Sequence, residues 1–229
     1  DMGGTSFDVS VVRDDRIEVV TQGEIDRLPV RMPMVEIRTI GAGGGSIARV
    51  RTGGQMTVGP ESAGARPGPV CYGRGGSEPT VTDANLLLGR LPAALLGGTM
   101  HLDTQRARDA LEPLARELGL DVDAFAASAV EIVDNNMAGA VRQVSIRRGI
   151  DPRDYVLVAF GGAGPPHAAR LAQLVGIRRV LIPPHPGLGS CNGMLIADAM
   201  LDDVQTFVAS GAGLDAAAER LRLGGGRRG

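Results

Sequence analysis

The sequence predicts an α/β fold in which a mixed sheet carries helices on both faces. Three observations indicate this class: strand-like segments occupy the first 40 residues, amphipathic helical segments fill the middle, and two short apolar runs alternate with helices near the end. Strands that alternate with helices are typical of layered α/β domains. The pattern occurs once and shows no internal repeat, so we expect one lobe over residues 1–200, followed by a tail over 201–229.

The N-terminal segment is predicted to form meandering strands. The stretches FDVSVV and RIEVV lie between Ser6 and Val20, with Asp14 and Asp15 as the turn between them. A third strand is expected over 34–40. The next segment, about 41–80, is so rich in glycine and proline that we expect an insertion shaped as a long loop, with only brief strands.

Helices are expected in the middle of the chain. A short helix over 82–91 precedes one that begins after Asp103 or Thr104 and ends at Gly119. A longer helix runs over about 123–148, and Gly149 stops it. Its apolar stripe, in which we interpret the methionine as core, consists of Phe125, Ala129, Ile132, Val133, Met137, Ala140, Val141 and Val144.

Two apolar strands alternate with the last helices. The run YVLVAF over 155–160 has the length and composition of a strand that is buried on both faces of a sheet. A helix over 168–175, a strand over 180–182 and a helix over 190–200 follow. The tail ends in LGGGRRG, and we expect it to be poorly ordered.

Composition limits the classes of function. The 24 basic and 26 acidic residues leave a net charge of -2, which gives no field for nucleic acid or a membrane surface. The sequence contains neither an apolar run of about 18 residues nor a signal-peptide pattern. Cys71 and Cys191 lack metal-ligand spacing and read as free thiols, which fits a reducing compartment. We therefore expect a cytoplasmic protein.

The N-terminal glycine pair is a candidate phosphate site. In DMGGTSFDVSVV, Gly3 and Gly4 have no side chain to keep phosphate oxygens from main-chain N–H groups. Thr5 and Ser6 add hydroxyl groups, and Asp1 could hold hydrated Mg²⁺, which prefers oxygen ligands. The alternative is a glycine hairpin with a solvated aspartate, because short glycine motifs often occur without a ligand.

A second glycine cluster follows the apolar strand. FGGAGPPHAARL places Gly161, Gly162 and Gly164 before a helix N-terminus, where flat adenosine could lie. The cluster lacks the third glycine of a Rossmann fingerprint and the Gly-Lys-Ser/Thr of a P-loop. The two clusters together favour a nucleotide site, provided that both lie at one margin of a cleft.

Several other polar residues have open interpretations. The glycine- and proline-rich segment 59–76 forms either a wall of a cleft, a subunit contact or a well-packed loop. No residue is assigned as a nucleophile, since the segment offers no histidine near its cysteine. We expect His167 to start a helix, with orientation of the glycine turn or contact with a ligand as the alternatives. His101 and His185 are expected at the surface, and Asp83 and Asn85 are expected to cap a helix.

The motifs resemble those of a known ATPase superfamily. DMGGTSFDVSVV resembles the second phosphate motif of the actin, sugar-kinase and heat-shock-chaperone ATPases, and FGGAG resembles their adenosine motif. The resemblance implies a single ribonuclease H-like lobe. GAGGGSIARV, GPESAGARPGPVCYGRGGSEPTVTDANLLLGRL and FGGAGPPHA narrow it to the hydantoinase A family, which includes 5-oxoprolinases, N-methylhydantoinases and ATP-handling subunits of acetone carboxylases. The similarity runs from Asp1 to about Asp198.

The resemblance implies ATP and Mg²⁺ as cofactors. It directs the first cluster to the β- and γ-phosphates and the metal, and the second to adenosine; these residues are Asp1, Gly3, Gly4 and Thr5, then Gly161, Gly162 and Gly164. Asp8 is expected to be structural. The DMGGTS motif opens the second lobe in this family, so we expect a fragment that lacks the first lobe and binds ATP weakly.

The family reaction uses ATP to activate an unreactive carbonyl, which requires positioning and neutralisation of phosphate charge. We therefore expect part of an ATP-dependent cyclic-amide hydrolase of the hydantoinase or 5-oxoprolinase type, with a small-molecule substrate and a hydantoinase B-type partner. The alternatives are the ATP-handling subunit of an acetone-type carboxylase, a nucleotide-switch module and an inactive fragment.

Overall fold

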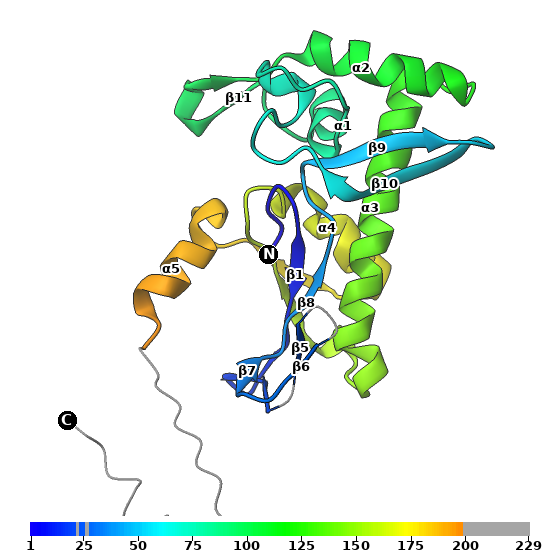
Figure 1. The fold of residues 1–229 in the computed structure, drawn as a ribbon. Helices are drawn as coiled ribbons and strands as arrows, with labels where there is room; N and C mark the ends of the chain where they lie inside the picture. Colours follow the sequence, from blue (N-terminus) through cyan, green and yellow to red (C-terminus); the bar gives the residue numbers. More distant parts are fainter. Residues whose placement is uncertain (22, 26–27, 199–229) are drawn as a thin grey trace, which may run out of the picture. The chain divides into compact units, whose positions relative to one another are not determined.

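The computed structural model describes residues 1–21, 23–25 and 28–198 (Figure 1). Contacts divide the chain into two units, Asp1–Leu195 and Ile196–Gly229. All described strands and the helices α1 to α4 belong to the first unit. The predicted tail over 201–229 and the end of the last predicted helix, residues 199–200, lie outside the described residues.

The described strands pair in two-stranded ladders. They are β1 (Phe7–Val9), β2 (Val12–Arg13), β3 (Arg16–Ile17), β4 (Val19–Val20), β5 (Gly23–Ile25), β6 (Leu28–Val30), β7 (Met34–Val35), β8 (Arg38–Ile40), β9 (Ser46–Arg51), β10 (Gln55–Ser62), β11 (Ala94–Leu95), β12 (Met100–His101), β13 (Val156–Val158) and β14 (Arg179–Leu181). The helices are α1 (Val81–Leu87), α2 (Thr104–Glu117), α3 (Val122–Val144), α4 (Pro165–Val175) and α5 (Gly189–Ile196).

Two of these ladders lie next to the glycine clusters. Strand β1 pairs antiparallel with β8, and β13 pairs parallel with β14. Helix α4 connects the parallel strands, as such a crossover requires. The ladders are joined where the N–H of Met2 donates to the carbonyl of Phe160 at 3.0 Å. The fold is therefore mixed α/β, as predicted.

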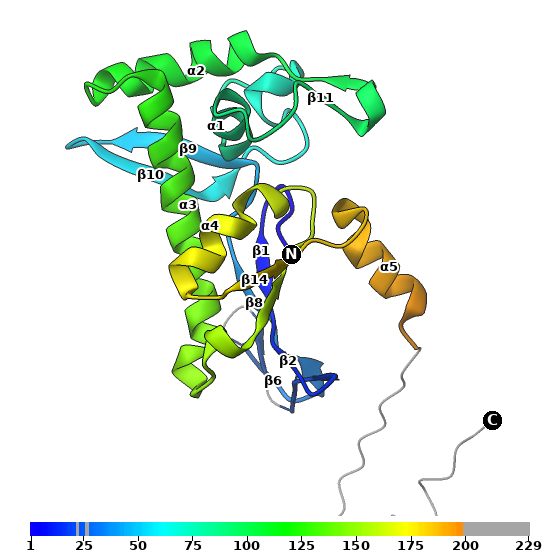
Figure 2. The same cartoon turned by 180° about the vertical axis from the view of Figure 1, so that it is seen from behind.

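Helix α3 organises the core. It packs against α1, α2 and α4 and against β1, β8 and β10, and both views show it running alongside the strands (Figures 1 and 2). The predicted apolar stripe faces inward, with Ile132 partly buried and the other members buried. Met137 is 1% exposed, which confirms it as core. Asp121 caps the helix by accepting from the N–H of Ala124 at 2.8 Å.

The strand over 155–160 is not buried on both faces. Leu157 packs against the core, whereas Val156 is 39% and Val158 is 47% exposed. On β14, Leu181 pairs with Val158, so it lies on the same face, and it is 54% exposed. Successive strand side chains point to opposite faces, so one face of this ladder lies against α3 and α4 and the other is open among the described residues. A run of apolar letters cannot show which face is covered.

The segment over 41–80 contains more regular structure than predicted. Strands β9 and β10, of six and eight residues, form an antiparallel hairpin whose turn includes Gly53 and Gly54, both with positive φ. The hairpin of β5 and β6 was also not predicted. The turn at Asp14 and Asp15 is confirmed, because both residues have positive φ between β2 and β3.

The predicted helices are present, with shifted ends. Helix α2 begins after Asp103, whose carboxylate accepts from the N–H of Arg106 at 3.0 Å. Helix α3 gives way near Ser145 to a 3-10 turn, and Gly149 follows in the left-handed conformation. Helix α5 ends at Ile196. Within the described residues, every helix is too short or too polar to span a membrane.

Candidate functional site

Three glycine-rich segments meet at one end of the β1 and β13 strands. We call them the N-terminal turn (residues 1–6), the central loop (41–46) and the strand-end loop (160–164). The N–H of Met2 donates to Phe160, and the N–H of Ala163 donates back to the Met2 carbonyl at 2.9 Å. Figure 2 shows the N-terminus beside the segment that leads into α4. The two clusters singled out in the sequence therefore lie side by side.

The central loop packs against the N-terminal turn and is hydrogen-bonded to it. The N–H groups of Gly44 and Gly45 donate to the carbonyls of Gly3 and Gly4 at 3.0 and 2.7 Å. A Cβ on Gly43 would lie 2.6 Å from the carbonyl of Gly4, so only glycine allows this approach. Sequence analysis did not include this loop in the site, although the cluster GAGGGS was the signal that could have identified it.

The opposite side of the N-terminal turn is open. Gly4 and Thr5 are exposed, and a Cβ on Gly3 or Gly4 would meet no atom within 4 Å. No described residue accepts a hydrogen bond from the N–H of Gly4 or Thr5. The turn therefore presents main-chain donors that no described residue engages, and such donors bind phosphate oxygens in glycine loops.

Hydroxyl groups flank these donors. The Ser62 hydroxyl donates to the Gly4 carbonyl at 3.3 Å and lies 3.4 Å from the Thr5 hydroxyl. The N–H of Gly64 donates to the Ser62 oxygen at 3.1 Å. This start of the 59–76 segment thus forms an edge of the turn. Sequence reasoning missed Ser62, because only the β9–β10 hairpin brings it there.

Asp1 lies against the strand-end loop, where its carboxylate is close to Gly161. Its side chain is half-buried and accepts a hydrogen bond from the Ser190 hydroxyl at 2.6 Å. The described residues contain no cluster of three or more ligating side chains. One carboxylate fits Mg²⁺, which is commonly bound through one or two carboxylates together with substrate phosphates and water. Asp8 has a structural role, as expected, since it accepts from Ser6 and Thr39 at 3.0 and 2.5 Å.

The glycines of the strand-end loop differ in their surroundings. Gly161 is buried with φ +86°, and a Cβ there would collide with the Asp1 carboxylate and the main chain of Met2. A Cβ on buried Gly164 would collide with the main chain of Phe160. Gly162 is exposed, with no atom near its hypothetical Cβ. Two of the three glycines are thus explained by close packing, and Gly162 faces open space.

His167 is fully buried behind the strand-end loop. Its Nδ1 lies 2.6 Å from an oxygen of Asp134, and its Nε2 lies 3.0 Å from the amide nitrogen of Asn85. The prediction that Asn85 caps a helix is wrong, because its side-chain amide contacts His167 on α4. His101 and His185 are exposed, as predicted.

Asp83 caps α1 and also holds the 59–76 segment. It forms a capping box with Thr80, which confirms the predicted cap. Its carboxylate additionally accepts from the N–H groups of Cys71 and Val70 at 2.7 and 3.3 Å. Burial, followed by the nearby Asp83 charge, raises the pKa of the Cys71 thiol. A buried, neutral thiol is not a nucleophile, in agreement with the sequence assignment.

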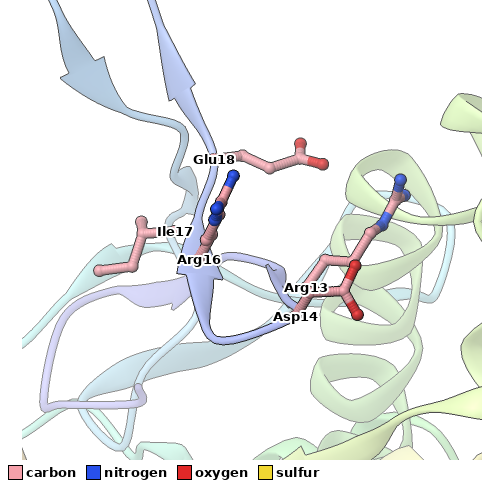
Figure 3. A pocket seen from close by; sticks show the side chains of 5 residues that line it. All are labelled: Arg13, Asp14, Arg16, Ile17 and Glu18. Atoms are coloured by element: carbon pink, nitrogen blue, oxygen red, sulfur yellow. The ribbon is translucent and has the colours of Figure 1, made fainter.

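A surface depression elsewhere has no connection with the glycine loops. It lies at the β2–β3 hairpin and is lined by Arg13, Asp14, Arg16, Ile17 and Glu18 (Figure 3). The side chains point in different directions rather than toward a common point. None of them belongs to the three loops, so we assign no site here.

Open glycine N–H groups at strand ends, beside one carboxylate, are typical of phosphate-binding α/β proteins. The family described as hydantoinase/oxoprolinase matches residues 1–203. The chain belongs to this hydantoinase/oxoprolinase family.

Several known proteins are similar in sequence to most of this chain. The caprolactamase subunit alpha of Pseudomonas jessenii is 46% identical over 210 residues, covering 90% of this chain and 30% of the relative. A structure of ATP-dependent caprolactamase from that organism matches with a TM-score of 0.80 and 42% identity, over 98% of this chain and 34% of the other. A nucleotide-free acetone carboxylase, studied for ATP-dependent acetone carboxylation, matches with a TM-score of 0.76 and 32% identity, over 82% and 27%. The chain thus spans about a third of their length.

Proposed function

We propose that this chain is the second, nucleotide-handling lobe of an ATP-dependent cyclic-amide hydrolase, with the ribonuclease H-like fold of actin-like ATPases. The observation that carries the proposal is the N-terminal turn, in which packed loops leave the N–H groups of Gly4 and Thr5 open. Family membership and the similarity to an ATP-dependent caprolactamase support a cyclic amide as the substrate class.

The residues present fit ATP and Mg²⁺. Gly3, Gly4 and Thr5 would hold the β- and γ-phosphates, and Asp1 would hold the metal. When bound, ATP supplies a phosphoryl group that activates the amide carbonyl. The chain contributes orientation and charge neutralisation. On the adenosine side, Gly162 offers the open surface.

Gly161 and Gly164 would shape that adenosine surface indirectly, by letting the strand-end loop pack on its neighbours. Close packing, rather than ligand contact, accounts for glycine at both positions, and the positive φ of Gly161 adds to it there.

Further polypeptide is expected to complete this lobe. The apolar face with Val156, Val158 and Leu181 is open among the described residues, and the relatives are about three times as long. We assign the cover of this face to a first lobe within the same longer protein. A hydantoinase B-type subunit is the expected partner, in line with the name of caprolactamase subunit alpha.

The second candidate is the ATP-handling subunit of an acetone-type carboxylase. The match to acetone carboxylase favours it, since that structure aligns with 82% of this chain at 32% identity. Both candidates use the same nucleotide turn and differ in the carbonyl that is activated.

The test measures ATP hydrolysis by the full-length protein with its partner subunit. Caprolactam, 5-oxoproline and hydantoin are compared with acetone plus bicarbonate. We expect a cyclic amide to stimulate turnover, and stimulation by acetone with bicarbonate alone would favour the carboxylase. Absence of stimulation by any of them would contradict both candidates.

Gly4→Val tests the site itself. The added side chain meets open space in the fold, so folding should be retained while phosphate access is blocked, and we expect turnover to fall by about 100-fold. Asp14→Asn at the β2–β3 turn is the control, because asparagine tolerates positive φ. Unchanged turnover in Gly4→Val would rule out the proposed phosphate site.

A further inference from the structure

A row of buried polar side chains connects three helices. Asp134 on α3 and His167 on α4 are each 1% exposed, and Asn85 on α1 is 3% exposed. The amide nitrogen of Asn85 can only donate, so His167 Nε2 accepts and the Nδ1–H donates to Asp134. The planar ring thus sets the separation between its two partners.

One end of the row is tied to the central loop. Thr82 and Asn85 are three residues apart on α1, which places them on the same helix face. The N–H and the hydroxyl of Thr82 both donate to the carbonyl of Gly44, each at 2.7 Å. Helix α1 therefore holds the central loop with one residue and His167 with another.

The middle of the row is tied to the strand-end loop. His167 lies in the first turn of α4, and its N–H donates to the carbonyl of Gly164 at 3.1 Å. The Cβ of Ala163, which precedes Gly164, would lie 3.3 Å from a Cβ on Gly44. The row consequently spans the two loops that flank the N-terminal turn.

The row is not built for stability alone. The Asn85 side-chain oxygen is buried and has no hydrogen-bond partner among the described residues. An unpaired buried acceptor is destabilising, and an apolar side chain of similar size would avoid this cost. A positional role explains why an amide occupies this place.

We propose that the Asp134–His167–Asn85 row fixes the spacing of the central and strand-end loops, which makes His167 a positioning residue for the bound nucleotide. The ligand in this statement rests on the proposed function. The mechanical link between the loops does not, so the two can be tested apart.

Two substitutions separate positioning from folding. His167→Asn keeps a donor near the Nδ1 position for Asp134 and loses the contact with Asn85. Asn85→Leu removes the same contact and the unpaired oxygen, and it leaves the Nε2 of His167 without a donor. In the full-length protein we expect each to raise the KM for ATP about 10-fold with a smaller change in kcat. Because the contact is shared, the double variant should resemble either single variant.

Stability distinguishes this role from simple core packing. The Asn85→Leu variant should keep its unfolding temperature while its KM increases, because the loss of the unpaired Asn85 oxygen offsets the Nε2 of His167 that is left without a donor. A parallel loss of stability and activity, or an unchanged KM in a folded variant, would overturn the positioning role.

Hydrogen exchange tests the mechanical link without nucleotide. In the whole 229-residue chain, we expect either substitution to speed amide exchange in both 41–46 and 160–164, while the β2–β3 hairpin keeps its wild-type rates. Faster exchange confined to the substituted helix would refute the link. If loop exchange responds but the wild type shows no ATP turnover, the proposed function fails and the link stands.

Discussion

Gly161→Ala should separate the N-terminal turn from the strand-end loop. The new Cβ would lie 2.7 Å from the Met2 nitrogen and closer still to the Asp1 carboxylate. An alanine with φ near +86° costs about 1–2 kcal/mol. Relief of the collision would break the two hydrogen bonds of Met2, at about 1 kcal/mol each.

The expected loss in free energy of unfolding is therefore about 3–4 kcal/mol. At a urea m-value of about 2–3 kcal/mol/M, the midpoint should move down by about 1–2 M. Circular dichroism of the 229-residue chain across a urea series measures this shift. Gly162→Ala is the matched control, since it adds the same methyl group one residue later into open space, and its effect should stay within about 0.5 kcal/mol.

Equal midpoints for the two alanine variants would refute the reasoning. They would mean that the main chain of Met2 does not pack against Gly161 in solution. The convergence of the two glycine clusters, on which the candidate site depends, would then be incorrect.

The described contacts lead to four further predictions. In the native chain a thiol reagent should modify exposed Cys191 and spare Cys71, with both reacting after denaturation. Burial in the folded state raises the pKa of the Cys71 thiol above its ordinary value of 9.0. The contribution of this thiol to the free energy of unfolding should therefore be fully present below pH 9.0 and decline above it, as a pH series of denaturation curves would show. Asp83→Ala should lower the free energy of unfolding by about 3–5 kcal/mol, because buried donors lose their acceptor. Thermal unfolding measures this loss, and a much smaller effect would contradict the prediction. Val158→Lys should leave the midpoint of this chain nearly unchanged yet impair folding of the full-length protein, and normal full-length yield would argue against a covering lobe.

Local signals made much of the fold predictable. Asp103 and Asp121 cap α2 and α3 through contacts within three residues, and the α3 stripe follows from helical period. Glycine clusters likewise identified two of the three loops at the candidate site. These features depend on neighbours in the sequence.

The missed features depend on distant partners. The open face at Val158 requires knowing that no described helix covers it, and the positions of Ser62 and His167 depend on contacts across 57 and 82 residues. The difference between Gly161 and Gly162 arises from whether the Met2 main chain lies opposite. Residue type alone contains no information about such contacts.

A phosphate site made of main-chain N–H groups does not discriminate between substrates. The N–H groups of Gly4 and Thr5 would bind any phosphate ester in the same way, whichever molecule accepts the phosphoryl group. Under the proposed function, selection between a lactam and a ketone must therefore be encoded away from the three loops. One nucleotide site could then serve reactions of several carbonyl compounds, with the differences between them confined to the surfaces around the three loops.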